Sequence, residues 1–206
     1  MPVPPASFET IGPEQVRRDE TEAALTEQQQ EASEDAVMTR IGQAVILLHA
    51  GDREEARNRL GAIWSEIGEE GHSLHRCTLA HYMADAQDDP ADELAWDLRA
   101  LAAADAPTAD PAPGGPRGEE APGPGAHQAM RVFYPSLHLS LAADYVKLRR
   151  PDAARIHLAR ARAATGALSD DGYGNGVRAA IAGLERRLVT ERDQSPAPRP
   201  FPEQSG

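Results

Sequence analysis

The sequence predicts an all-α protein, and three observations support that prediction. Alanine and leucine supply most of the apolar residues, while aromatic residues make up only 4% of the chain. Small and unbranched apolar side chains favour close-packed helices over a sheet. Runs that alternate apolar and polar residues, as a half-buried strand does, are missing, and seven segments instead carry apolar residues at the three- and four-residue spacing of a helix face.

Four helical segments are expected before residue 105. The first runs from about residue 35 to 50 and stops at Gly51, and the second begins after the N-cap residue Asp52. The fourth follows Asp89 as N-cap, with Pro90 as its first residue. The residues expected to face inward are Val37, Ile41, Ala44, Val45 and Leu48 in the first helix, Ala56, Leu60, Ile63 and Ile67 in the second, Leu79, Ala80 and Met83 in the third (about 73–86), and Leu94, Ala95, Leu98, Leu101 and Ala102 in the fourth.

Three more helical segments are expected after residue 130. The fifth spans about residues 135–148, Pro151 opens the sixth, and the seventh begins near Tyr173. The seventh has the most regular amphipathic spacing in the chain. The residues expected to face inward are Leu137, Leu141, Ala142 and Tyr145 in the fifth, Ala154, Leu158 and Ala161 in the sixth, and Val177, Ile181, Leu184 and Leu188 in the seventh.

Segments without a helical pattern divide the chain. Residues 1–33 are Pro-rich and then Glu- and Gln-rich, which predicts a disordered or loosely helical acidic arm because few apolar groups offset the entropy of ordering. Residues 105–130 repeat Pro, Gly and Ala, which predicts a disordered insertion, and residues 191–206 are expected to be a disordered tail. Residues 34–104 then hold two helix pairs, and residues 131–190 hold a third pair and a capping helix.

Charge and composition narrow the possible functions. The net charge of −12 repels phosphate backbones and argues against a nucleic-acid partner. The longest apolar stretch, residues 44–48, is too short to span a bilayer, and residues 1–5 lack the features of a secretory signal. The single cysteine, Cys77, allows no intrachain disulfide, which suits a cytoplasmic protein. Lys147 is the only lysine among many arginines, a composition typical of an actinobacterial genome.

One arrangement of large and small residues recurs in the helix pairs. It is clearest in Leu141 and Ala142, Tyr145, and then Ala154, Leu158 and Ala161. Small residues let two helix backbones approach, and large ones fill the groove between them. The step of twelve residues from Ala142 to Ala154 is repeated from Ala44 to Ala56. Ala80 follows Ala44 by 36 residues, and without the insertion it precedes Ala142 by about the same interval, which indicates an internal repeat.

This pattern resembles tetratricopeptide repeat (TPR) proteins of actinobacterial type over about 155 residues. The sequence departs from the family pattern at Gln43, in the long turn of residues 87–90, and at Ala95, which arrives three residues late. The resemblance implies an α-α superhelix of about three helix pairs plus a C-terminal capping helix, with the first helix of each pair lining a concave groove. The groove residues that it implies are Ile41, Val45, Leu48, His49, Cys77, His81, Asp85, Leu139, Ala143, Val146 and Lys147.

The expected function is protein binding without chemistry. A largely apolar groove suits a partner helix or extended peptide, so we expect a TPR-like adaptor or scaffold with no cofactor, catalytic residue or metal. The groove could instead be filled in part by the seventh helix or the arms of the chain itself. The Lys/Asn set with which chaperone-binding TPR domains hold a terminal carboxylate is missing around Lys147.

A second hypothesis is a metal- or thiol-based sensor. Cys77 and His81 are four residues apart and therefore lie on one helix face. Thiolate and imidazole are good ligands for zinc and copper. Further ligands would have to come from a neighbouring helix, where His138 and His157 are possible donors.

Overall fold

In the computed structural model, residues 13–69, 71–106 and 130–193 are described, and every regular element within them is helical. The elements are α1 (Pro13–His49), α2 (Arg53–Ile67), α3 (Ser73–Asp85), α4 (Pro90–Asp105), α6 (Tyr134–Lys147), α7 (Pro151–Ala164), the short 3₁₀ helix η1 (Thr165–Ala167) and α8 (Gly172–Asp193). The prediction of an all-α protein is confirmed for these residues. None of their helices is long and apolar enough to cross a membrane.

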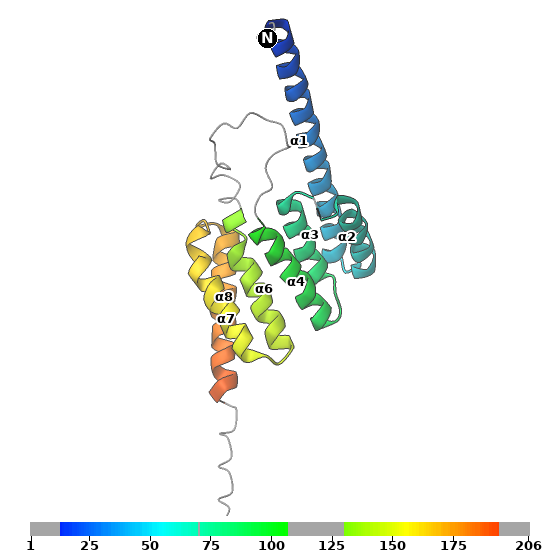
Figure 1. The fold of residues 1–206 in the computed structure, drawn as a ribbon. Helices are drawn as coiled ribbons and strands as arrows, with labels where there is room; N and C mark the ends of the chain where they lie inside the picture. Colours follow the sequence, from blue (N-terminus) through cyan, green and yellow to red (C-terminus); the bar gives the residue numbers. More distant parts are fainter. Residues whose placement is uncertain (1–12, 70, 107–129, 194–206) are drawn as a thin grey trace, which may run out of the picture.

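Helices that follow one another in the chain pack as pairs. α1 lies against α2, α3 against α4, and α6 against α7, while α8 covers α7 and α6 (Figure 1). Contacts between α4 and α6 join the first four helices to the last three. The packing of α4 against α6 therefore determines which side chains of the two halves come into contact.

The starts of two helices follow from their capping residues. A side-chain oxygen of Asp52 accepts a hydrogen bond from the backbone N–H of Glu55 at 3.3 Å. Asp89 accepts one from the N–H of Ala91 at 2.7 Å, and Pro90 is the first residue of α4. Each such cap contributes about 1 kcal/mol to helix stability. Both predicted starts are confirmed.

The first helix is longer than its apolar pattern indicates. α1 begins at Pro13, well before residue 35, and its first part projects beyond the other helices (Figure 1). Its Glu- and Gln-rich segment has few apolar residues, but Glu and Gln have high helix propensity. The expected acidic arm is therefore helical from residue 13 onward. The expected insertion and tail fall mostly on residues 107–129 and 194–206, which lie outside the described residues, as do residues 1–12.

Most residues predicted to face inward are buried. They lie in three packed clusters, one between α1, α2 and α3, one between α3, α4 and α6, and one between α6, α7 and α8. The buried ones are Ile41, Ala44, Leu48, Ala56, Leu60, Ile63, Leu79, Ala80, Met83, Leu137, Leu141, Ala142, Ala154, Leu158, Ala161, Val177, Ile181 and Leu188.

The inward face predicted for α4 was wrong in part, since Leu94, Ala95 and Leu101 are half-buried but the other two predicted residues are not. Leu98 is 42% exposed and Ala102 is exposed, whereas Asp97, Ala100 and Ala104 are buried. α4 packs against both α3 and α6, and alanines permit the close approach of two neighbours. The helix thus turns its alanines toward the core, with Leu101 packed beside them. An aspartate is buried with those alanines.

The turns after α1 and α6 have the same backbone hydrogen bonds. The bonds are Gly51 N to Leu48 O (3.1 Å) and Asp52 N to Leu47 O (3.0 Å) in the first turn, and Arg149 N to Val146 O (3.0 Å) and Arg150 N to Tyr145 O (2.8 Å) in the second. This pattern is the helix-ending motif in which a left-handed residue lets the next N–H reach back five residues. Both turns therefore reverse the chain in the same way.

Candidate functional site

The residues predicted to line a groove differ in their access to solvent. Ile41, Leu48, Cys77 and Val146 are buried and belong to the core. Val45, His81, Leu139 and Ala143 are half-buried, and His49, Asp85 and Lys147 are exposed. The four core residues offer almost no surface to a partner, so any binding surface along α1, α3 and α6 depends on the other seven.

Three of those seven residues meet in one group of charged side chains, here called the acidic cluster. Its members are His81 and Asp85 from α3, Glu93 and Asp97 from α4, and Asp144 and Lys147 from α6. α3, α4 and α6 thus bring together residues that are more than sixty positions apart. The sequence predicted a role for His81, Asp85 and Lys147 but not for the other three residues.

Two carboxyl groups form the buried layer of the acidic cluster. Asp97 is 2% exposed and Asp144 is 1% exposed. Burial and, after it, the charges of Asp97 and Glu93 raise the pKa of Asp144 to about 8, although Lys147 opposes them. Oδ2 of Asp144 accepts no hydrogen bond from any described residue, and the Asp97 carboxyl lies beside it. Asp144 therefore keeps its proton at neutral pH and can donate it toward Asp97.

Two basic groups lie over these carboxyls. Nδ1 of His81 is 3.1 Å from Oδ1 of Asp97. Burial alone would lower the pKa of His81, but its hydrogen bond to Asp97 and the charges of Asp97 and Asp85 raise it above the usual value. Nζ of Lys147 donates to Glu93 and lies 3.5 Å from Oδ1 of Asp144. The Lys147 side chain is nevertheless 45% exposed, so the acidic cluster reaches the surface.

Asp85 stands at the surface of the acidic cluster and adds to its negative charge. Desolvation raises the pKa of Asp85 although the residue as a whole is exposed; His81 and Lys147 lower it, and Asp97 and Glu93 raise it. Four carboxyl groups thus face one ammonium and one imidazole. The site has an excess of acidic groups that the described residues do not fully balance.

The structure does not favour thiolate chemistry at Cys77. Its side chain is 1% exposed, and burial, with the charge of Asp97, raises the pKa of its thiol to about 12. A protonated, buried thiol is a poor nucleophile and a poor metal ligand. No hydrogen bond or ion pair links it to His81, whose Nδ1 faces Asp97.

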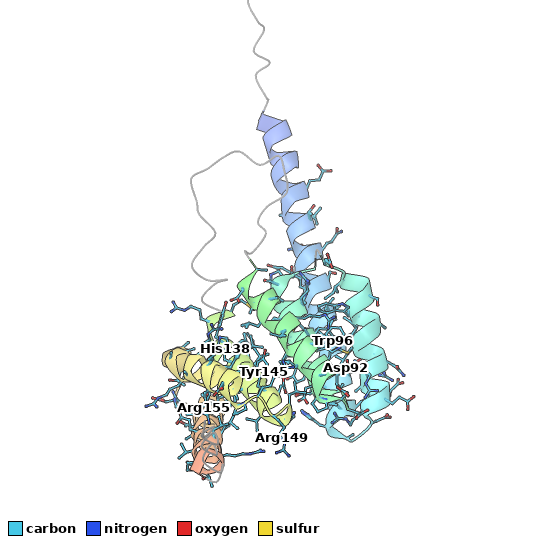
Figure 2. All side chains as sticks on the ribbon, turned by 60° about the horizontal axis from the view of Figure 1, so that its bottom comes forward. Asp92, Trp96, His138, Tyr145, Arg149 and Arg155 are labelled. Atoms are coloured by element: carbon cyan, nitrogen blue, oxygen red, sulfur yellow. The ribbon has the colours of Figure 1, made fainter. Side chains whose placement is uncertain are left out.

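His138 and His157 pair with each other instead of joining Cys77. Their Nδ1 atoms are 3.2 Å apart, and the ring of Tyr145 stacks on His157 with centroids separated by 5.4 Å. Figure 2 shows His138 and Tyr145 on α6. Burial lowers the pKa of both histidines. Within the described ranges, no three or more His, Cys, Asp or Glu side chains are gathered as metal ligands would be.

A cavity of about 420 Å³ lies at the opposite end of α6 from the acidic cluster. Its lining is mainly alanine, together with Met130, Arg131 and Tyr134. The hydroxyl of Tyr134 donates to Asp105 at 2.5 Å. No residue predicted for the groove lines this cavity, and no described group in it suggests a ligand.

Comparison of the chain with protein-family models, curated proteins and solved structures finds no match.

Proposed function

We propose that the protein is a non-enzymatic protein–protein interaction module, a TPR-like array that binds a segment of a partner protein on the face shared by α1, α3 and α6. The observation that carries the proposal is the convergence of His81 and Asp85 from α3 with Lys147 from α6. The resemblance to TPR proteins had implied a groove position for each of these residues. Their convergence supports one continuous surface across α3 and α6.

Two features of the fold support an array of equivalent helix pairs. The turns after α1 and α6 have the same hydrogen bonds, with Gly51 and Arg149 in the same place. Ala44, Ala56, Ala142 and Ala154 are all fully buried, so the small residues of both pairs lie where close helix contact requires them. Equivalent pairs that stack side by side present their first helices along one face.

The side chains available on this face suit a peptide. Val45, Leu139 and Ala143 supply half-buried apolar surface, and His49, Asp85 and Lys147 supply exposed polar groups. Interfaces commonly combine an apolar centre with a polar rim. A partner helix or extended segment with apolar anchors would cover the first set and contact the second. The burial of Cys77 gives no support to a metal or thiol sensor.

Random twelve-residue peptides displayed on phage test the proposal. Ala143 lies on α6 one helical turn from both Leu139 and Lys147, so the larger side chain of Ala143→Gln would occupy the binding face. The matched control is Ala153→Gln, since Ala153 is also half-buried but lies on α7. We expect the wild-type chain to enrich a defined peptide group, with affinity at least tenfold lower in Ala143→Gln and unchanged in Ala153→Gln. Enrichment of no peptide, or equal binding by both variants, would contradict the proposal.

A further inference from the structure

We propose that the acidic cluster receives a basic side chain, arginine or lysine, of the bound partner segment. This inference rests on the proposed function and adds the chemistry of the partner. It is carried by the charges of the acidic cluster, by an unpartnered buried oxygen within it, and by the one ammonium group that the cluster already holds.

The balance of charge at the acidic cluster favours a cation. Asp85 and Glu93 lie toward the surface, and Asp97 and Asp144 lie below them. No hydrogen bond or ion pair joins the Asp85 side chain to another described residue, and its pKa is raised first by desolvation and then by the charges of Asp97 and Glu93. A further positive group beside Asp85 and Glu93 would reduce the repulsion among these carboxylates.

Asp144 has a buried oxygen that receives no N–H group from the described side chains, and below pH 8 the proton that Asp144 directs toward Asp97 takes that place. Its Oδ2 atom is buried and has no hydrogen-bond donor among the described residues. A buried acceptor without a donor is unfavourable, so the site gains when a proton or an N–H group reaches it. A guanidinium carries five N–H donors in one plane and can contact more than one carboxylate at once.

Lys147 shows that the site accommodates an ammonium group. Its Nζ contacts Glu93 and approaches Asp144, although almost half of its side chain faces solvent. An exposed lysine has many rotamers and can turn into water when a competing cation arrives. The partner's basic group would then share or replace these contacts. Leu139 and Ala143 on the same helix would contact apolar residues beside it.

The surrounding groups set the pH dependence of this binding. Asp85, Glu93, Asp97, His81 and Lys147 all face Asp144 or one another. Because the pKa of Asp144 is raised to about 8, a proton competes with the cation at pH 6 and is largely gone at pH 9. Deprotonation of His81, whose pKa is raised above its ordinary value, also removes a positive charge as the pH rises. Both changes strengthen cation binding as pH rises, while Lys147 stays charged.

Four peptide libraries test the inference with the full chain at physiological salt. The peptides are eleven residues long, random except for a central residue fixed as Arg, Lys, Leu or Glu, and binding is measured by fluorescence anisotropy. We expect the Arg and Lys libraries to bind at least tenfold more tightly than the Leu library, and the Glu library to bind most weakly. The advantage of Arg over Leu should increase from pH 6 to pH 9.

Matched variants show whether a preference for Arg comes from the acidic cluster or from the general negative charge of the chain. Glu93→Gln and Asp85→Asn should each reduce the preference for Arg to less than threefold. Asp92→Asn should keep it, since Asp92 is an exposed carboxylate in the same first turn of α4 (Figure 2). Circular dichroism checks that each variant keeps its helix content.

The outcomes distinguish this inference from the proposed function. Equal binding of the Arg and Leu libraries, with both weakened by Ala143→Gln, would overturn the basic side chain and leave peptide binding intact. A preference for Arg that survives both Glu93→Gln and Asp85→Asn would also overturn it. Binding of none of the libraries would overturn both proposals.

Discussion

Arg149 occupies in the turn after α6 the place that Gly51 occupies in the turn after α1. Both residues have positive φ, 57° for Arg149 and 93° for Gly51, and both donate to the carbonyl three residues earlier. Glycine adopts this conformation without steric cost, whereas a residue with a Cβ does not. The two turns therefore reach the same geometry at different energetic cost.

Replacing Arg149 with glycine should stabilise the protein. Relief of the left-handed strain outweighs the added entropy of the unfolded chain, and we expect a gain of about 0.5–1 kcal/mol in the free energy of unfolding. Gly51→Ala should have the opposite effect, although a Cβ at Gly51 would meet no atom within 4 Å. Urea denaturation measures both. Arg150→Gly is the control, because Arg150 has an ordinary φ of −114° and its replacement should destabilise.

Asp144→Asn should remove a pH-dependent cost of folding. Asp144 has a folded pKa of about 8, above its unfolded value near 4, so folding takes up a proton between these limits. The stabilisation that this proton uptake gives to the folded state is therefore greatest below pH 4, and it decreases as the pH rises toward 8. The Asn amide can donate to Asp97 without taking up a proton. We expect Asp144→Asn to be more stable than wild type at pH 8 by more than about 1.4 kcal/mol, the value of one pKa unit.

The pH series provides the check on that prediction. Unfolding free energies at pH 5, 6, 7, 8 and 9 should show the difference between Asp144→Asn and wild type growing up to pH 8 and then levelling. Asp152→Asn should show no such growth, because the Asp152 side chain is 96% exposed. A difference that stays constant with pH would mean that Asp144 is ionised in the folded protein.

The histidines should titrate on opposite sides of their usual pKa. Asp97 raises the pKa of His81, while burial lowers the pKa of His75, His138 and His157. NMR titration of the imidazole signals should therefore find His81 alone of these four above 6.5. In Asp97→Asn the pKa of His81 should fall below its wild-type value. An unchanged pKa in that variant would remove Asp97 as the cause.

Cys77 should be inert in the folded protein. Its pKa of about 12 leaves almost no thiolate at pH 8, and its burial blocks access. A thiol reagent should label it at least a hundredfold more slowly in buffer than in 8 M urea. Rapid labelling of the folded chain would revive the thiol-sensor hypothesis.

Apolar spacing and capping residues predicted most helix positions correctly. Asp52, Asp89 and Pro90 mark helix starts through capping and backbone preferences that depend only on neighbouring residues, so they can be read from the sequence. The face of α4 was missed because three-dimensional packing, and not local pattern, chose its alanines over Leu98. The early start of α1 was missed because helix propensity without an apolar face gives a weak signal.

The acidic cluster was only half predictable. His81, Asp85 and Lys147 follow from helix positions in the resemblance to TPR proteins. Asp97 and Asp144 were missed because an aspartate in a helix is ordinarily exposed. Their spacing could have predicted burial, because residues three apart lie on the same helix face. Asp97 lies three residues before the buried Ala100, and Asp144 lies three residues after the buried Leu141. Which aspartates face each other across α4 and α6 depends on the joint between the two halves.

The environment of Lys147 tests peptide binding on this face most directly. Because Lys147 is the chain's only lysine, reductive ¹³C-methylation labels it together with only the terminal amine, and methylation preserves its charge. Lys147→Arg identifies its NMR signal. Addition of a peptide selected by the wild-type chain should shift the Lys147 methyl signal in proportion to the bound fraction, and a scrambled peptide should not. A selected peptide that binds by anisotropy but leaves this signal unmoved would show that partners bind elsewhere.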